Sequence, residues 1–551
     1  MRLTKVLLTW FVITTNVSAP GKGNITVTLS MNGVVQKETI PLNVRIPTAL
    51  ERRSTITVLE SGKSKTYSVK AGEYYRGKHT LTISASPAVS LPLALNYLNE
   101  YPYGCLEQTV SGAFPFLAMD NLEKSGFLSK EAAASGKDRL ELGIGNILSM
   151  QRSNGSFSWW PGSNDTWSDG SVYAAHFLLE AYNRKMPGVT EKSIQSALKW
   201  VEKQISSNNA SKNRLFCAYA GYVLALGGRD SGVQYMRNLL TTPDQDFAAM
   251  IAALALIRGG YAAEGNAALQ DLMKAEVWRK PEMLCGCNRD AAGLGMALYL
   301  LLENMPRHPD AGKIAALLAS KIRPDRNAWG DTQANAWAAL GLAAFAADFP
   351  SKGENTVVIR QDGSQKAFSV KTKLDIAMTP GKTVTVINSG KSVLTIRQTT
   401  EGHPVKAEKR NGTIQMRRMY LDENGFPVSS VKHGETVTVR IYLKAVNDIT
   451  DLVICDLLPA GLEIEDERLL NRTNARNIKK NGLSSKYMEK GVDRFLFFGD
   501  YDSDRTEPVY LEYRTRAVSR GVYTLSGCSA EAMYDPDLTG SIPGQGHFIV
   551  E

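Results

Sequence analysis

The sequence predicts a multidomain protein of α and β structure, in which a long helical segment lies between β-rich segments. Residues 22–90 alternate polar and apolar side chains with the period of β-strands. From residue 91 to residue 349 the apolar spacing is helical, and after Pro350 it returns to the β period. A chain of 551 residues exceeds one typical hydrophobic core, so about three or four domains are expected.

The composition narrows the class of protein. A hydrophobic content of 43% and a charged content of 22% are typical of a folded globular chain. The net charge of +9 is modest, and lysines and arginines are scattered, which favours a solvated surface over nucleic-acid binding. The sequence has no run of about 18 apolar residues, which argues against a spanning helix. We therefore expect no nucleic-acid partner, and membrane association only through an anchor on a partner chain.

The first nineteen residues fit two interpretations. A basic start, an apolar stretch and the triplet Val17-Ser18-Ala19 sketch a signal peptide with its cleavage site. A proline directly after that triplet, and threonines within the apolar stretch, suit a β-strand equally well. The strands that follow are clearer, because residues 25–29 and 80–83 alternate and Asn32-Gly33 is a strong hairpin turn.

The helical segment contains internal repeats. Residues 215–226 and 247–257 superpose at a constant offset, and each run ends in a glycine pair, Gly227-Gly228 or Gly259-Gly260. A second repeat relates the segment that begins at Trp159 to the segment that begins at Trp329. Helix pairs that cannot bury their apolar faces alone stack on their neighbours. The repeats therefore predict an α/α toroid.

An α/α toroid is also the architecture of terpene cyclases and protein prenyltransferases, so the site has to decide the function. A cyclase needs an acidic cluster in the cavity, and a prenyltransferase needs an Asp/Cys/His zinc set. The helical segment has only His176 and His308, without ligand companions at motif spacing. Five tryptophans could line a pocket, although core or rim packing is the commoner role of such residues: Trp159, Trp160, Trp167, Trp329 and Trp337.

The stretch with the most distinctive chemistry is Tyr101-Pro102-Tyr103-Gly104-Cys105-Leu106-Glu107-Gln108-Thr109. Cys105 and Gln108 are three positions apart, which at a helix start places both side chains on one face. Gly104 would allow the tight backbone approach that a ring between them needs. Displacement of ammonia from Gln108 by the Cys105 sulfur would give an internal thioester. The alternatives are a buried structural thiol and a protease nucleophile, which needs a neighbouring base.

This stretch resembles the thioester signature of bacterial alpha-2-macroglobulins. The resemblance implies that Cys105 and Gln108 form the thioester and that Tyr101 shields it, and the flanking Tyr103 is a second candidate cover. Gly104, Leu106 and Glu107 complete the motif. The implied function is an exported, periplasmic or extracytoplasmic endopeptidase inhibitor that captures proteases through lysine amines. It would be neither an enzyme nor dependent on a cofactor.

The resemblance also implies a domain order. The expected ranges are 1–47, the end of a macroglobulin-like β domain; 48–90 and 351–404, two parts of a CUB-like β domain; 91–350, the helical thioester domain inserted between them; and 405–551, a receptor-binding-like β-sandwich. Leu457-Leu458-Pro459-Ala460-Gly461 and Tyr534-Asp535-Pro536 resemble loops of that last domain.

Two features qualify the expected function. Complement relatives carry a histidine that steers the acyl group to hydroxyls, whereas residues 216–222 here contain none, which favours direct transfer to amines. Only about ninety residues precede the thioester domain, too few for a bait region. We expect a fragment, a chain that works with an upstream macroglobulin-domain partner, or a chain without the trigger. A covalent adhesion or tagging module is the alternative function.

The cysteines give no further site. Cys285-Gly-Cys287 is too short for a zinc knuckle, and Cys217 lies in an apolar helical run. Cys455 and Cys528 lie in the same expected β domain and could pair in an oxidising compartment.

Overall fold

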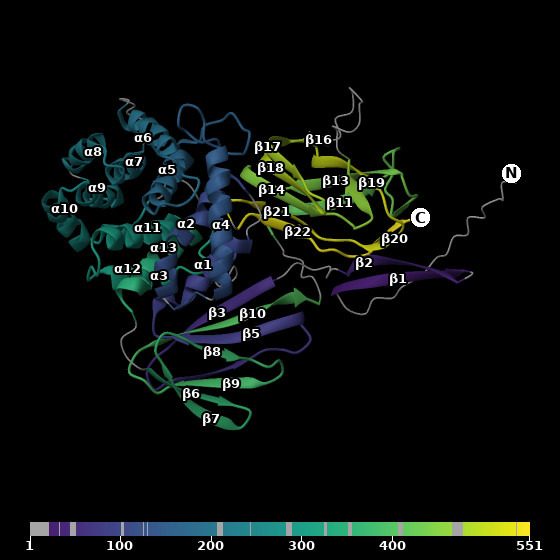
Figure 1. The fold of residues 1–551 in the computed structure, drawn as a ribbon, viewed down its shortest axis with the longest axis horizontal. Helices are drawn as coiled ribbons and strands as arrows, with labels where there is room; N and C mark the ends of the chain where they lie inside the picture. The colour runs from purple at the N-terminus through teal and green to yellow at the C-terminus, as the bar shows by residue number, and fades with distance from the viewer. Residues whose placement is uncertain are drawn as a thin grey trace.

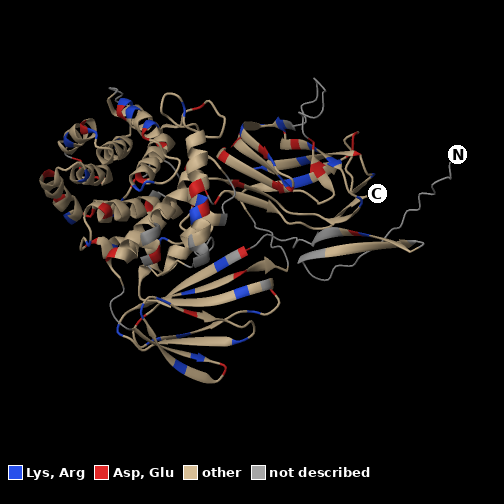
Figure 2. Ribbon diagram, in the orientation of Figure 1, with Lys and Arg blue, Asp and Glu red and all other residues tan. Residues whose placement is uncertain are grey.

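The computed structural model describes residues 21–31, 33–44, 51–100, 104–124, 126–128, 130–206, 213–242, 244–282, 289–323, 328–350, 355–405, 412–465, 478–535 and 537–551. Figure 1 shows a helical body beside a C-terminal β-sandwich, a second β-sandwich below them, and a β-hairpin that projects from the rest. Figure 2 shows lysines and arginines interspersed with acidic residues along these elements. Among the described residues, no helix combines the length and apolar character that a membrane span requires.

The hairpin consists of β1 (Gly21–Met31) and β2 (Val34–Val44), paired antiparallel with no third strand among the described residues. Gly33 turns between them with φ +81°, a value that favours glycine. Leu29, Val34 and Val35 are exposed. Isolated two-stranded hairpins are marginally stable in water. The hairpin therefore presents apolar side chains that nothing in the described structure covers.

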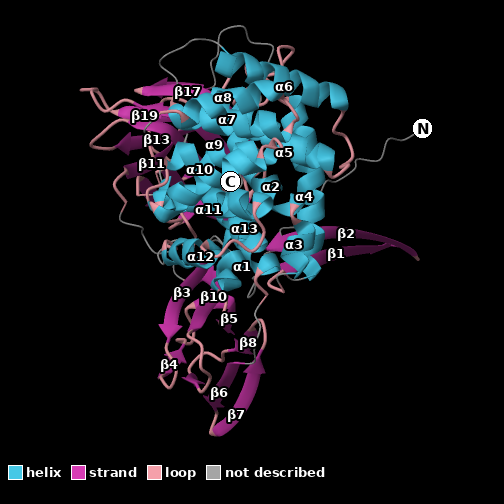
Figure 3. Cartoon of the chain, turned by 90° about the vertical axis from the view of Figure 1, so that its left-hand side faces the viewer, coloured by secondary structure: helices cyan, strands magenta, loops and turns pink. Residues whose placement is uncertain are grey.

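The lower sandwich is built from strands on both sides of the helical body. One sheet has the order β3-β10-β5-β8 and the other β4-β9-β6-β7, and pairs such as Leu59↔Leu394 join distant parts of the chain. The helical body is therefore an insertion between the strands of one sandwich (Figure 3). The strands are β3 (Glu51–Leu59), β4 (Ser64–Ser68), β5 (Tyr74–Ser84), β6 (Asn355–Gln361), β7 (Ser364–Val370), β8 (Leu374–Ala377), β9 (Thr383–Asn388) and β10 (Leu394–Pro404).

The helical body begins with a short 3-10 turn, Pro87–Ser90, and has a second one at Val277–Arg279. Its helices are α1 (Leu91–Glu100), α2 (Leu106–Leu117), α3 (Met119–Lys124), α4 (Lys130–Ser149), α5 (Ser168–Asn183), α6 (Glu191–Ser206), α7 (Arg214–Leu226), α8 (Asp230–Leu240), α9 (Phe247–Arg258), α10 (Ala262–Lys274), α11 (Arg289–Asn304), α12 (Ala311–Ser320) and α13 (Thr332–Asp348).

Six of these helices form a closed inner ring. Each of α2, α5, α7, α9, α11 and α13 contacts the next, and α13 returns to α2. The inner helices are apolar on nearly every side, as expected for helices packed all round, whereas α6 and α8 bury one face. Where α11 meets α13, a side chain on Gly295 would lie 2.4 Å from the Trp337 backbone, so glycine permits the close approach. The expected α/α toroid is confirmed.

The predicted repeat corresponds to α7 and α9. Gly227 and Gly259 cap the two helices, and the next residues, Gly228 and Gly260, take φ values of +69° and +90°. The second glycine of each pair thus ends the helix in the left-handed conformation.

The C-terminal sandwich contains the sheets β11-β13-β19-β15 and β17-β18-β14-β21-β22, with β16 added beside β19 and a smaller sheet, β12-β23-β20. Residues 436–442, in which polar and apolar side chains alternate along the sequence, lie in β13. The strands are β11 (Gln415–Leu421), β12 (Ser430–Val431), β13 (Thr436–Lys444), β14 (Ile449–Leu457), β15 (Leu462–Ile464), β16 (Ile478–Asn481), β17 (Leu483–Lys490), β18 (Arg494–Tyr501), β19 (Val509–Ala517), β20 (Gly521–Thr524), β21 (Cys528–Ala532), β22 (Thr539–Ile542) and β23 (His547–Val550).

The suggested pairing of Cys455 with Cys528 is wrong. Both thiols are free. Cys455 lies opposite Ser529, and Cys528 lies opposite Asp456, so the two cysteines are one register step apart on neighbouring strands. A step of one residue turns side chains to opposite faces of the sheet. Cys528 packs in the sandwich core, and Cys455 packs on the face toward the toroid.

Candidate functional site

Cys105 is the N-cap of α2, the first helix of the inner ring, with φ −67° and ψ 165°. The backbone N–H of Cys105 donates to Gln108 Oε1 at 3.3 Å, and the backbone N–H of Gln108 points to the Cys105 sulfur. This is the reciprocal arrangement of a capping box, with cysteine in the place of serine or threonine. The side chains of Cys105 and Gln108 therefore lie close together in the first turn of the helix.

The start of α2 is fixed from outside as well. The N–H of Leu106 donates to the carbonyl of Trp159 at 2.9 Å, and the Thr109 hydroxyl donates to the Cys105 carbonyl at 2.8 Å. Cys105 is 0% exposed and Gln108 is 5% exposed. The thiol and the carboxamide are thus held in place and out of bulk water.

The cover comes from the C-terminal sandwich. Gln108 Nε2 donates to Met533 Sδ at 3.2 Å, and the Tyr534 hydroxyl lies 3.7 Å from the Cys105 sulfur. Both residues follow β21. Around them lies one apolar cluster that spans the two bodies: Cys105, Trp160, Val453, Leu496, Phe498 and Met533, with Trp159, Cys455, Tyr487 and Tyr534 at its edge. The site is therefore an interface between the toroid and the sandwich.

Sequence reasoning missed this cover in part. Tyr534 entered the prediction only as a loop residue, and Met533 was not singled out. No local signal marks Met533, since its contact with Gln108 joins residues 425 positions apart. The predicted shields, Tyr101 and Tyr103, lie outside the described residues.

Burial is the main influence on the pKa of the Cys105 thiol. Burial raises the pKa of Cys105 well above its ordinary value, and the neighbouring Glu107 carboxyl raises it further. The thiolate is the nucleophilic form and the form that leaves when a thioester is cleaved. The closed site therefore disfavours a free Cys105 thiolate.

Two family models match the chain. The A-macroglobulin TED domain matches residues 79–213, and the bacterial alpha-2-macroglobulin MG10 domain matches residues 413–537. The alpha-2-macroglobulin of Escherichia coli strain K12 is 26% identical over 490 residues, which cover 83% of this chain and 29% of that protein. The alpha-2-macroglobulin of Xylella fastidiosa (Temecula1) is 26% identical over 496 residues, which cover 83% of this chain and 30% of that protein.

The chain is similar to bacterial alpha-2-macroglobulins over most of its length, and both matched family models support that family. The chain corresponds to the C-terminal part and spans about three tenths of the length of these relatives.

Solved structures of the family agree on the fold. The native E. coli alpha-2-macroglobulin structure from domain MG7 to the C-terminus has a TM-score of 0.78 and 24% identity, with 97% of this chain and 88% of that chain covered. The Salmonella alpha-2-macroglobulin reacted with methylamine has a TM-score of 0.78 and 25% identity, with 97% and 36% covered. The expected fold class, a multidomain α and β chain of this family, is confirmed.

Glu107, the acidic residue of the motif, points into the toroid. Its Oε1 accepts from the Ser111 hydroxyl at 2.5 Å, and its Oε2 accepts from Thr332 at 2.7 Å. These bonds tie the first turn of α2 to the start of α13. Burial raises the pKa of Glu107 to about 7, against the lowering effect of the two hydroxyls.

Glu107→Gln should remove a pH dependence of stability. Between about pH 4.5 and pH 7 the folded protein keeps a proton that the unfolded chain has released, so the free energy of unfolding falls as the pH rises. The shift corresponds to roughly 3 kcal/mol lost by pH 8. Urea unfolding at pH 5 and pH 8 measures it. Between pH 5 and pH 8, Glu107→Gln should lose less free energy of unfolding than the unaltered protein, by about that amount. Glu141→Gln, which alters an exposed carboxylate on α4, should lose as much as the unaltered protein. Equal losses in all three proteins would refute the assignment.

The other two described residues at the start of the motif, Leu106 and Gly104, differ in their surroundings. Leu106 is fully buried under the site. Gly104 was expected to permit a tight approach of the backbone. In the structure it is exposed, and a side chain there would meet no atom within 4 Å. The steric argument for glycine at this position is therefore not supported.

His176 is far inside the toroid rather than at the site. Its ring contacts Phe114 and Trp337, and its Nδ1 lies 2.9 Å from the Tyr219 hydroxyl. Burial lowers the pKa of His176 to about 4, which keeps the ring neutral at physiological pH. Trp337 and Trp329 also lie in the toroid core, whereas Trp159 and Trp160 lie beside Cys105 at the interface.

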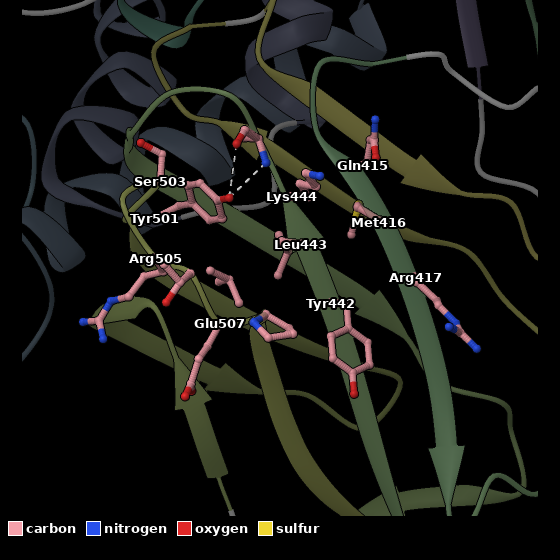
Figure 4. A pocket seen from close by; sticks show the side chains of 14 residues that line it. Gln415, Met416, Arg417, Tyr442, Leu443, Lys444, Tyr501, Ser503, Arg505 and Glu507 are labelled. Carbon is pink, nitrogen blue, oxygen red and sulfur yellow. Dashed lines mark hydrogen bonds between the residues drawn. The ribbon is translucent and has the colours of Figure 1, made fainter.

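A separate open cavity of about 510 Å³ lies on the C-terminal sandwich (Figure 4). It is bounded by β11, β13 and residues 503–509, and Tyr501 closes one end by bonding its hydroxyl to the backbone of Ala445. None of the described motif residues, 104–109, lines it.

Proposed function

We propose that this chain is the covalent-capture part of an alpha-2-macroglobulin-like endopeptidase inhibitor. The observation that carries the proposal is the pairing of Cys105 with Gln108 at the start of α2, under the cover of Met533 and Tyr534. The names of the family relatives support protease inhibition over a toroid enzyme or an adhesion module.

The chemistry has two steps. The Cys105 thiol adds to the Gln108 carboxamide carbon, the C–N bond breaks, and ammonia leaves with the thiol proton, which gives the thioester. Later a lysine amine of a protease attacks the same carbon. The C–S bond breaks, the amine proton passes to sulfur, and the products are an amide cross-link and a free Cys105 thiol. A held amine attacks far faster than a dissolved one because its effective concentration is high.

The cover controls the second step. Apolar packing keeps water from the thioester, which would otherwise hydrolyse it. Burial also raises the pKa of the leaving thiol, so departure of the sulfur is unfavourable while the sandwich is docked. Separation of the sandwich from the toroid would remove both obstacles together.

The acceptor is proposed to be an amine, reached directly. Residues 216–222 lie on α7 and hold no histidine, and His176 contacts Tyr219 in the toroid core instead of the site. The Salmonella relative was solved after reaction with methylamine, which makes that amine a suitable probe for this chain.

The proposed partners are target proteases and an upstream macroglobulin-domain segment, either in the same polypeptide or as a separate chain. The exposed apolar side chains of the β1–β2 hairpin support the second partner, since a two-stranded sheet needs further packing. We further propose a periplasmic or extracytoplasmic location, no enzymatic activity and no cofactor, and we keep the predicted domain ranges.

Covalent capture should depend on the lysines of the target. We expect the purified chain, mixed with an active protease, to give a conjugate that survives boiling in detergent and contains a Gln108–lysine cross-link by peptide mass spectrometry. A protease whose lysines have been dimethylated should give no conjugate, because a tertiary amine cannot form the amide. Equal conjugation of the blocked protease would refute amine capture, and equal conjugation of unrelated lysine-bearing proteins would favour a tagging module.

A further inference from the structure

We propose that Tyr487 and Lys486, on β17, are positioning residues that set how fast an amine reaches Gln108. They would do so by holding the C-terminal sandwich on the Trp159-Trp160 turn of the toroid. The inference rests on the thioester function proposed above and adds a control on the reaction, separate from the residues that touch the reacting atoms.

The first part of this docking contact is aromatic. Trp160 is 3% exposed, although it belongs to a turn at the rim of the toroid. Its ring stacks on Tyr487 with centroids 4.9 Å apart and an interplanar angle of 11°, and it packs against Phe498 at 4.5 Å. Stacked aromatic pairs add to the stabilisation that their buried area gives. The sandwich therefore contributes two of the rings that bury Trp160.

The second part is a cation held over an indole. Lys486 Nζ lies 2.7 Å from carboxylate oxygens of Asp451 and of Asp500, both within the sandwich. The same ammonium lies 5.4 Å from the ring centroid of Trp159, which is itself stacked on Trp167 at 4.4 Å. The two carboxylates aim the ammonium at the toroid, where it makes a cation–π contact.

The turn that receives these contacts also holds the reactive helix. The carbonyl of Trp159 accepts the N–H of Leu106 at 2.9 Å, the first residue of α2. The Ser158 hydroxyl donates to the Trp160 carbonyl at 2.9 Å and fixes the turn from the toroid side. Docking of the sandwich on the turn and the geometry of the Cys105–Gln108 pair are thus joined through one hydrogen bond.

The contact belongs to the same apolar cluster as the cover but is made by other side chains. Met533 and Tyr534 lie against Gln108 and Cys105, whereas Tyr487 lies against Trp160. The ion pair between Arg323 and Asp537, at 2.6 Å, also joins the two bodies, but Asp537 is 69% exposed, and such pairs contribute little. Among these contacts, the aromatic one is the buried part of the docking that does not touch the reacting groups.

The test measures the rate of methylamine incorporation. Release of the Cys105 thiol reports this rate. Tyr487→Ala should raise this rate roughly tenfold, because loss of the ring that stacks on Trp160 weakens docking. Tyr487→Phe keeps the ring and should react at the unaltered rate. The matched control is Tyr442→Ala, which removes a tyrosine from the same sandwich beside the open cavity of Figure 4. An unchanged rate in Tyr487→Ala, or an equal rise in Tyr442→Ala, overturns the proposal.

The experiment separates this inference from the proposed function. Intact mass first reports whether the thioester is present. If it is absent, the proposed function fails, and the docking contact is tested by alkylation of the buried Cys105 thiol, mapped by peptide mass spectrometry. Tyr487→Ala should raise that alkylation rate by the same factor relative to Tyr487→Phe, and equal rates would overturn the inference.

Discussion

Cys105→Ala should lose covalent amine incorporation completely. Without the sulfur, Gln108 remains an ordinary carboxamide, whose carbon does not react with amines at neutral pH because the amide nitrogen is a poor leaving group. Mass spectrometry after incubation with methylamine should find no adduct on the peptide that contains Gln108. We expect Cys105→Ala to fold, because alanine fits the same buried N-cap position with a smaller side chain.

The matched control is Cys217→Ala. Cys217 is also a buried free thiol, on α7 in the toroid core. The Cys217→Ala variant should incorporate methylamine as the unaltered chain does. Incorporation in Cys105→Ala equal to that in Cys217→Ala would show that Cys105 is not the partner of Gln108.

Met533→Ala should shorten the lifetime of the thioester. Met533 is 4% exposed and accepts a hydrogen bond from the Gln108 carboxamide, so removal of its side chain opens a gap over the reactive carbonyl. If the cover supplies about 1.4–2.7 kcal/mol of the hydrolysis barrier, the rate of hydrolysis rises roughly 10–100-fold. The appearance of free Cys105 thiol in buffer without amine measures this rate.

Met488→Ala distinguishes loss of the cover from loss of sandwich stability. Met488 belongs to the same sandwich and packs against its core rather than against Gln108. We expect hydrolysis of Met488→Ala at the unaltered rate. Comparable acceleration in both methionine variants would assign the effect to a loosened sandwich and remove Met533 from the cover.

Several elements could be predicted from local pattern. The repeated runs that became α7 and α9 each combine a helical apolar period with a glycine pair, and both features act within one helix. The strand at residues 436–442 was visible in its alternation. The Cys105–Gln108 pair was predictable for the same reason, because a spacing of three is a property of a single helical turn.

The cover and the docking contact could not be predicted in this way. Met533 and Tyr534 reach the site only because a sandwich hundreds of residues away packs on the rim of the toroid. Trp160 was expected to be core or rim packing, and its contact with Tyr487 depends on the same docking. The failed Cys455–Cys528 pairing has a related cause, since one step of strand register decides which face each thiol takes.

The mass of the purified, untreated chain tests the central claim most directly. A bond between the Cys105 sulfur and the Gln108 carbonyl makes the protein lighter by one ammonia than its composition requires. Methylamine should then add once and release one titratable thiol, both located on the peptide that carries Cys105 and Gln108. A full-composition mass that methylamine leaves unchanged would contradict the account.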